Sequence, residues 1–303
     1  MQSASVKNAL QWFSQLVQDK IIIEPVKLKE PEQNGISWDI LRTDLIHPVC
    51  SGNKIFKLRY YLEDAILKNH TAIHSFGGAW SNHIVATALV AKACGLTATG
   101  YIRGEEPREW SQTLKDANQY GMKLVFLPRD EFDKICFNPP VKEDSYPIPI
   151  GGYGFPGAKG ASHILDNLPV NSYTHIICAA GTGTMAAGLS LAGKSGKLVC
   201  INAVRNDKLL DEIKQLAPGA AITVYNDYLF GGFAKADPDL IKFMNSFFLQ
   251  NSIPTDFVYT AKLMFAIQDL ISKNAFPTGS RILAIHSGGL QGNKSLKIGQ
   301  LQF

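Results

Sequence analysis

The chain has 303 residues, of which 46% are hydrophobic and 18% charged, with a formal net charge of +4. This composition supports a sizeable core and excludes an intrinsically disordered chain. No run of lysine or arginine favours a nucleic-acid partner, and no apolar stretch is long enough to cross a membrane. The opening residues MQSASVKN lack the pattern of a secretory signal, so we expect a cytoplasmic protein.

The cysteines and histidines form no obvious ligand set. There are five cysteines without a C-x-x-C pair, and the seven histidines contain no H-E-x-x-H motif. Cys178 and Cys200 lie in apolar runs typical of strands, where a free cysteine behaves as a small hydrophobic residue. We therefore expect neither disulfides nor a metal site.

Short apolar runs alternate with helical patterns along the chain. The predicted strands cover residues 71–76, 97–102, 123–127, 174–180, 198–204, 222–225 and 281–286. The predicted helices cover residues 81–93, 110–120 and 185–192, with another beginning near Lys54. An N-terminal helix is expected to contribute Phe13 and Leu16 to packing. The alternation predicts βαβ units and an α/β fold with parallel sheets covered on both faces.

A stretch rich in proline and glycine, residues 138–157, is the best candidate for a domain boundary. We expect a smaller α/β domain over residues 56–149 and a larger one formed by residues 1–55 and 150–303. A cleft between two such lobes is the usual place for a ligand.

Lys54 stands at the start of a predicted helix, after a glycine and a polar turn. The helix dipole disfavours a cation there, and desolvation would lower the pKa of the amine further, as a lysine that condenses with a carbonyl group requires. The alternative is a solvated lysine beside an ordinary cap. Lys57 and Arg59 are interpreted as surface charges.

The segment from Phe76 to His83 turns a strand into a helix through two glycines. Ser81 and Asn82 then lie at a helix N-terminus, whose free N–H groups can bind a carboxylate or phenolate oxygen. The alternative is a common Ser/Asn cap, with His83 as a buried histidine that has its own partner.

The segment Ala179-Ala-Gly-Thr-Gly-Thr-Met-Ala-Ala-Gly188 follows another strand and opens an alanine-rich helix. Its backbone N–H groups, its two threonines and the helix dipole favour a phosphate. The spacing G-x-G-x-x-A also fits a dinucleotide site, so an NAD(P)-binding oxidoreductase stays open as an alternative. The next strand carries no acidic residue for a ribose, which disfavours NAD. A tight turn with small residues for packing is the structural alternative.

Two further segments near the C-terminus carry polar groups. Tyr259 and Thr260 begin a helix and look exposed, and Ser287 follows the predicted strand 281–286 at a glycine turn. The C-terminal ends of strands are where open α/β sheets place ligands. Each residue also has an ordinary structural explanation, as a core aromatic or a turn residue.

In this order, the segments resemble the fold-type II pyridoxal-phosphate enzymes, and in particular the family of D-cysteine desulfhydrase and 1-aminocyclopropane-1-carboxylate (ACC) deaminase. The resemblance extends from about Pro48 to the C-terminus. Five motifs carry it: Gly52-Asn-Lys54, Gly77-Gly-Ala-Trp-Ser81-Asn82-His83, Gly181-Thr-Gly-Thr184, Val258-Tyr259-Thr260-Ala-Lys262 and His286-Ser287-Gly288-Gly289. It implies two lobes with mostly parallel sheets, as in the tryptophan synthase β subunit, and a homodimer.

The resemblance also implies roles for residues. Pyridoxal 5′-phosphate would be bound by Lys54, Asn82, Gly181, Thr182, Gly183, Thr184, Thr260 and Ser287. Lys54 would be bonded covalently to it, and Thr260 and Ser287 would lie near its pyridine nitrogen. Lys54, Tyr259 and Ser81 would be catalytic, and Ser81, Asn82 and His83 would bind a small amino-acid substrate.

The residue types near the pyridine nitrogen bear on the substrate. ACC deaminases carry Tyr-Glu and His-Leu at two positions where this chain has Tyr259-Thr260 and His286-Ser287, as D-cysteine desulfhydrases do. Neutral hydroxyls make the ring a weaker electron sink than a carboxylate does. We therefore expect D-cysteine desulfhydration, which yields pyruvate, ammonia and hydrogen sulfide, with ACC deamination as the alternative.

Two positions depart from the family. Phe233 stands where the family has a second active-site tyrosine, and the arginine usually found two places after the lysine is absent. A phenyl group cannot transfer a proton, so a catalytically weak pyridoxal-phosphate-binding protein is a further alternative.

Overall fold

The computed structural model describes residues 20–27 and 35–303. The packing predicted for Phe13 and Leu16 lies outside the described residues. All five cysteines are free. None of the helices within the described ranges is long and apolar enough to cross a membrane.

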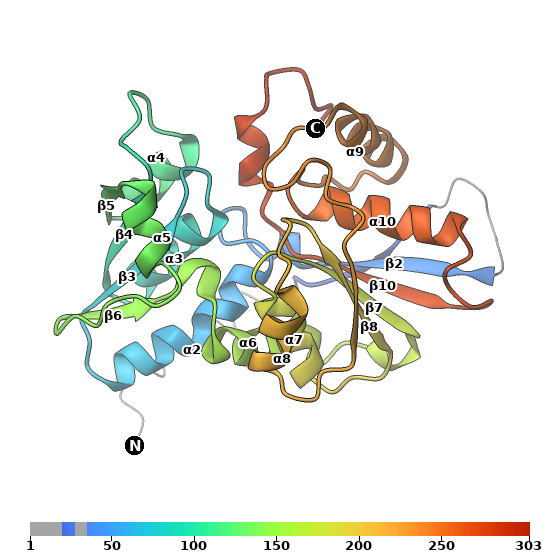
Figure 1. Cartoon of the computed structure of the whole chain (residues 1–303), viewed down its shortest axis with the longest axis horizontal. Coiled ribbons are helices and arrows are strands. Elements are labelled where there is room, and N and C mark those ends of the chain that lie inside the picture. The colour runs from blue at the N-terminus through green and yellow to red at the C-terminus, as the bar shows by residue number, and fades with distance from the viewer. Residues whose placement is uncertain (1–19, 28–34) are drawn as a thin grey trace.

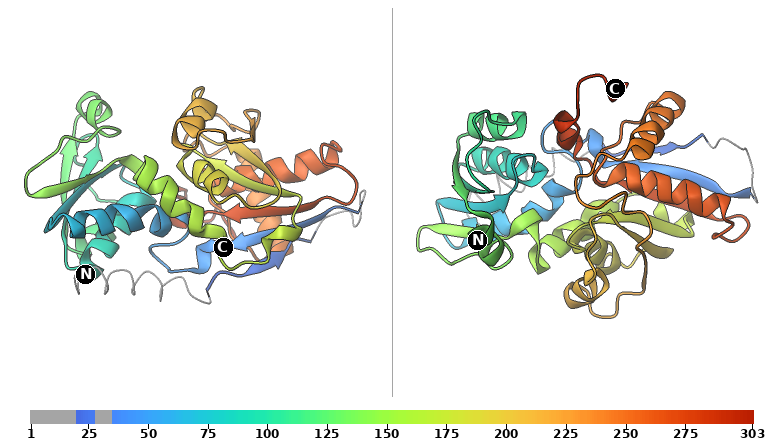
Figure 2. Two further views of the ribbon diagram at one scale, coloured as in Figure 1. Left: turned by 90° about the horizontal axis from the view of Figure 1, so that it is seen from below. Right: turned by 45° about the horizontal axis from the view of Figure 1, so that its top comes forward.

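The described residues form two sheets, one in each of two lobes (Figure 1). The two sheets remain separate in both views of Figure 2. The smaller sheet has the order β5-β4-β3-β6 and is parallel throughout. The larger has the order β1-β2-β10-β7-β8-β9 and is parallel except for the β1–β2 pair. The expected α/β fold is therefore confirmed.

The strands are β1 (Ile23–Pro25), β2 (Ser37–Arg42), β3 (Ala72–Gly77), β4 (Thr97–Arg103), β5 (Met122–Leu127), β6 (Ser145–Ile148), β7 (His175–Ala180), β8 (Lys197–Asn202), β9 (Ile222–Tyr225) and β10 (Arg281–His286). The α-helices are α2 (Asn53–Leu67), α3 (Asn82–Ala93), α4 (Gln112–Gln119), α5 (Arg129–Ile135), α6 (Phe155–Ala161), α7 (Thr184–Leu191), α8 (Leu209–Leu216), α9 (Pro238–Asn251) and α10 (Thr260–Ser272).

The stretch 138–157 is more than a boundary between the lobes. It contains β6, which pairs in parallel with β3 at the edge of the smaller sheet. Pro147 lies within this strand, and proline is tolerated at an edge because no further strand needs its missing N–H. The domain limits at residues 55 and 149 stay a prediction.

One apolar cluster joins the two lobes. It includes Ile73 of β3 and Ala98 of β4 from the smaller sheet, and Cys178 of β7 and Ile285 of β10 from the larger one. Helices α2 and α6 pack closely against each other. A Cβ on Gly160 of α6 would lie 1.9 Å from the carbonyl oxygen of Phe56 of α2. The lobes are thus held by a shared core, and the loops between them are kept in place.

Candidate active site

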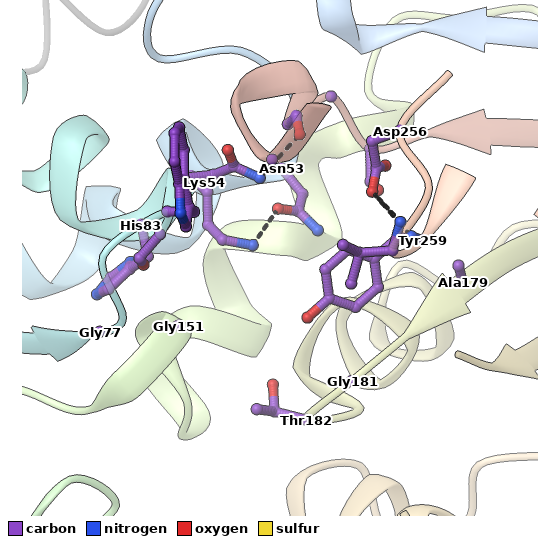
Figure 3. Close-up of a pocket in the computed structure, with 18 of the residues that line it drawn as sticks. Asn53, Lys54, Gly77, His83, Gly151, Ala179, Gly181, Thr182, Asp256 and Tyr259 are labelled. Carbon is purple, nitrogen blue, oxygen red and sulfur yellow. Dashed lines mark hydrogen bonds between the residues drawn. The ribbon is translucent and has the colours of Figure 1, made fainter. Parts of the chain in front are cut away.

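A cavity of about 350 Å³ lies between the lobes, and Figure 3 shows part of its wall. The segments after β3, β7 and β10 and the first turns of α2 and α7 form much of it. Parallel strands place ligands at their C-terminal ends, and small-molecule sites span about 300 to 1,000 Å³. The predicted site residues on the wall are Lys54, Ser81, Asn82, His83, Gly181, Thr182, Gly183, Thr184, Tyr259 and Ser287.

Lys54 enters the cavity from the first turn of α2. Gly52, with a φ of 70°, allows this entry: a Cβ there would lie 1.7 Å from the carbonyl oxygen of Ser287. The Lys54 Nζ donates a hydrogen bond to Asn53 Oδ1 at 3.0 Å. Burial lowers the pKa of the Lys54 amine to about 8, against the opposing effect of the Asp256 carboxylate. Roughly a tenth of this amine is then neutral at pH 7, enough for it to act as a nucleophile.

Lys57 is not the surface charge that the sequence suggested. Its side chain lines the same cavity, the residue is only 4% exposed, and its Nζ lies 3.5 Å from the carbonyl oxygen of Gly151. Burial lowers its pKa well below the ordinary value, and the neighbouring Lys54 lowers it further. The i, i+3 spacing from Lys54 was the available signal, because residues three apart share one face of a helix. Arg59 is also partly buried, and its Nε is enclosed without a hydrogen-bond partner.

His83 is buried and neutral. Burial lowers its pKa well below the ordinary value, and Lys54 and Lys57 add to the effect. Its Nε2 lies 2.7 Å from the Ser75 hydroxyl, which lies 2.8 Å from the carbonyl oxygen of Ile148. Because the serine donates its proton to that carbonyl, His83 Nε2 must be the donor in their pair. His83 Nδ1 is then an acceptor, buried without a partner.

Ser81 and Asn82 begin α3 as the sequence predicted. Ser81 is the N-cap, and its Oγ accepts a hydrogen bond from the N–H of Ile84. Asn82 Nδ2 donates to the carbonyl oxygen of Gly289 at 3.1 Å, while its Oδ1 is buried without a partner. This contact joins the start of α3 to the loop after β10, so the two lobes meet at the cavity.

The loop from Gly181 to Thr184 forms the opposite wall. Gly183 is the N-cap of α7 with a φ of 68°, and the Thr182 and Thr184 hydroxyls lie 2.9 Å apart. The first N–H groups of a helix lack partners within it and attract an anion. The structure therefore places a turn suited to an anion across the cavity from Lys54 (Figure 3).

Asp256 is a site residue that the sequence analysis missed. It is 1% exposed and lines the cavity, and its carboxylate accepts hydrogen bonds from the N–H groups of Val258, Tyr259 and Thr260. Its signal was its position just before α10, where an aspartate can cap a helix. Tyr259 does not sit exposed: its ring reaches into the cavity, and the hydroxyl comes close to Gly181 (Figure 3). Burial and Asp256 raise the pKa of Tyr259 well above the ordinary value.

Thr260 does not line the cavity, in contrast to the prediction. It is fully buried, and its hydroxyl donates to Asp256 Oδ1 at 2.8 Å. The Thr260 hydroxyl is therefore hydrogen-bonded to Asp256 and does not face the cavity. Ser287 does reach the wall, on the loop after β10.

These residues fit pyridoxal phosphate. The 181–184 turn suits its phosphate, and Lys54 supplies an amine for its aldehyde. The unpartnered Asn82 Oδ1 and His83 Nδ1 on the same wall are polar atoms that a bound molecule can satisfy.

The chain belongs to the family described as pyridoxal-phosphate dependent enzyme, whose model matches residues 40–288. It is therefore a pyridoxal-phosphate-dependent enzyme, and the dinucleotide alternative for residues 181–186 finds no support.

The chain is also similar to named relatives over most of its length. The chain is 30% identical to a Thermotoga maritima protein named "Putative 1-aminocyclopropane-1-carboxylate deaminase", over 86% of this chain and 91% of that one. It is 29% identical to a Pyrococcus horikoshii protein of the same name, over 85% and 86% of the two chains. A crystal structure of an "ACC deaminase homologue" superposes with a TM-score of 0.74 and 26% identity, covering 96% of this chain and 97% of that one.

Proposed function

We propose that the protein releases ammonia from a small amino acid in a pyridoxal-phosphate-dependent reaction, and that ACC is the first substrate to test. The observation that carries the proposal is the half-buried Lys54 side chain, whose desolvated amine lines the same cavity as the turn at 181–184. The names of the relatives support ACC over the D-cysteine that the sequence favoured.

The residues on the cavity wall also weigh against D-cysteine. D-cysteine was favoured because only neutral hydroxyls were expected near the ring. The cavity wall instead carries the Asp256 carboxylate, and the Thr260 hydroxyl is bonded to it. A carboxylate on the wall removes the ground for rejecting the more demanding ring opening. D-cysteine stays as the second candidate because Ser287 keeps a hydroxyl on the wall.

The roles of the residues follow from their positions. Pyridoxal phosphate, when bound, supplies an aldehyde for amines and a ring that accepts electrons from the substrate α-carbon. The Gly181–Thr184 turn and Lys57 would hold its phosphate, with the lysine adding positive charge. Asn82 would hold the ring edge at the start of α3.

Substrate contacts and proton transfers would fall to other groups. Ser81 and the N–H groups at the start of α3 would orient the substrate carboxylate and so select the bond that breaks. ACC has no hydrogen on its α-carbon, so the neutral Lys54 Nζ would take a proton from a ring methylene of ACC, whereas it would take the α-proton of D-cysteine. Tyr259, whose raised pKa keeps its hydroxyl protonated, would donate a proton to the carbon released when the ACC ring opens, or to the departing sulfur of D-cysteine. ACC and one water would then give 2-oxobutanoate and ammonia.

The test measures products. Purified protein loaded with pyridoxal phosphate is incubated with ACC and, separately, with D-cysteine, and ammonia, 2-oxobutanoate, pyruvate and sulfide are measured. We expect ammonia and 2-oxobutanoate from ACC and no turnover by Lys54→Ala. Lys68→Ala, at the exposed end of α2, is the matched control and keeps full activity. Full turnover by Lys54→Ala, with its yellow colour retained, would contradict the proposal.

A further inference from the structure

Lys262 is a buried lysine that the proposed reaction does not use. It lies in the first turn of α10, is fully buried, and its Nζ donates to the carbonyl oxygens of Ala203 at 2.7 Å and Gly232 at 2.8 Å. Ala203 follows β8, and Gly232 belongs to the segment 226–237 between β9 and α9. One amine therefore ties three parts of the chain together. Burying an amine is unfavourable unless it is hydrogen-bonded, so these two carbonyls define where it must sit.

The segment 226–237 has a backbone that needs such support. Phe230 and Ala234 have φ angles of 46° and 52°, values that residues other than glycine rarely adopt. Such a conformation persists only where the surroundings impose it. The Phe230 ring also packs edge-on against Phe265 of α10, with centroids 4.8 Å apart. Helix α10 therefore holds the segment at two points, Lys262 and Phe265, which lie one turn apart.

The held segment forms part of the cavity wall. Phe233 and Ala234 line the cavity, and Phe233 directly follows the glycine whose carbonyl Lys262 holds. Phe233 is 63% exposed, so little else fixes its ring. Lys262 and Gly232 are not on the wall, so any effect of the lysine on a bound molecule must pass through the segment.

We infer that Lys262 is a positioning residue, which sets where Phe233 and Ala234 stand on the cavity wall and through them the affinity for the amino-acid substrate. The inference rests on the proposed function for the identity of the bound molecule. The position of the segment does not depend on that function.

The experiment compares holoenzymes of the wild type and Lys262→Met, a side chain of similar length without donors. We expect faster hydrogen exchange in peptides covering 226–237, and a KM about tenfold higher with kcat within about twofold. The absorption spectrum of the bound cofactor stays unchanged. Lys273→Met, at the exposed end of the same helix, is the control and changes neither exchange nor KM.

A double-mutant cycle tests whether Lys262 affects substrate affinity through the segment 226–237. If Lys262 acts through the segment, Lys262→Met changes KM by less than about twofold when Phe233→Ala is already present. Lys262→Gln, which keeps N–H donors, should fall between wild type and Lys262→Met in both exchange and KM.

Three results would overturn the inference. These are unchanged exchange over 226–237, a full KM effect in the Phe233→Ala background, and failure of both Lys262 variants to fold. If the wild type turns over neither ACC nor D-cysteine, the exchange measurement alone decides, so failure of the proposed function is distinguishable from failure of this inference.

Discussion

Lys54, Lys57 and His83 line one cavity, and within residues 20–27 and 35–303 no carboxylate forms an ion pair with any of them. Burial without a paired anion favours the uncharged form of each group. A larger fraction of the Lys54 amine is thereby neutral and available as a nucleophile or a base. An anionic phosphate entering the cavity would shift Lys57 toward its charged form.

The lowered pKa of Lys54 predicts how the cofactor is captured. Only the neutral amine reacts with an aldehyde, so the rate at which apoenzyme captures pyridoxal phosphate should rise with pH through about 8 and level off above it. Stopped-flow absorbance between pH 6 and 10.5 measures this rate. A lysine with the ordinary pKa of an exposed amine would give a rate that still rises beyond pH 10. A profile of that second kind would show that Lys54 is not desolvated.

We predict that Tyr259 donates a proton during the reaction and contributes little to the affinity for the cofactor. Tyr259→Phe removes only the hydroxyl that faces the cavity. We expect kcat to fall about 10²-fold, with cofactor affinity within about twofold. Steady-state kinetics and cofactor titration measure the two. Tyr120→Phe, just past the end of α4, is the control. Unchanged kcat would assign the proton transfers to another group.

At the scale of elements, the cavity is built by turns at the ends of strands. The loops after β3, β7 and β10 each carry glycines that bring backbone close to the site. The loop after β10 contacts both α2, through Gly52, and α3, through Asn82. Residues far apart in sequence therefore take their positions from one another.

Gly183 gives a test of the turn that precedes α7. Gly183→Ala would strain a φ of 68° and place a Cβ 2.7 Å from Ile213 Cγ1. We expect a loss of about 1–3 kcal/mol in the free energy of unfolding and at least about tenfold weaker cofactor binding. Denaturant unfolding and cofactor titration measure these.

The matched control is Gly193→Ala, at the other end of the same helix. Gly193 has a φ of 60°, and its Cβ would meet no atom within 4 Å. It should lose about 1–2 kcal/mol of stability without any change in cofactor affinity. Equal cofactor affinities for the two variants would mean that the turn does not bind the phosphate.

The sequence predicted the elements with strong local patterns. The strands at 222–225 and 281–286 and the cap at Ser81 match the structure. It missed β6, because the prolines of that edge strand look like a linker. It also misplaced Lys57 and the Thr260 hydroxyl. Lys57 shares a helix face with Lys54, but it is buried by α6 and the 150–152 turn, which the local pattern does not reveal. The Thr260 hydroxyl turns to Asp256, four residues before it, and the position of Asp256 just before α10 was the signal for that contact.

At the scale of the molecule, the two lobes share one apolar cluster. A core that spans both sheets couples their unfolding, because neither lobe can open without exposing apolar surface of the other. The cavity between them is then a feature of a single cooperative unit. The family resemblance also implies a homodimer, which stays a prediction that light scattering can test.

The shared core predicts a single unfolding transition. Trp38 reports on the larger sheet, and Trp110 packs against Phe126 of the smaller one. Two variants that each keep only one of these tryptophans should show the same denaturant midpoint by fluorescence, equal to the midpoint from circular dichroism. Separate midpoints would show that the lobes unfold independently.

The most direct test of the central claim locates the covalent bond between protein and cofactor. The purified protein is loaded with pyridoxal phosphate, reduced with borohydride, digested and mapped by mass spectrometry. The predicted result is a pyridoxyl-phosphate group on Lys54 and on no other lysine. A label on Lys57 or Lys262 with Lys54 unmodified, or no label at all, would contradict the account.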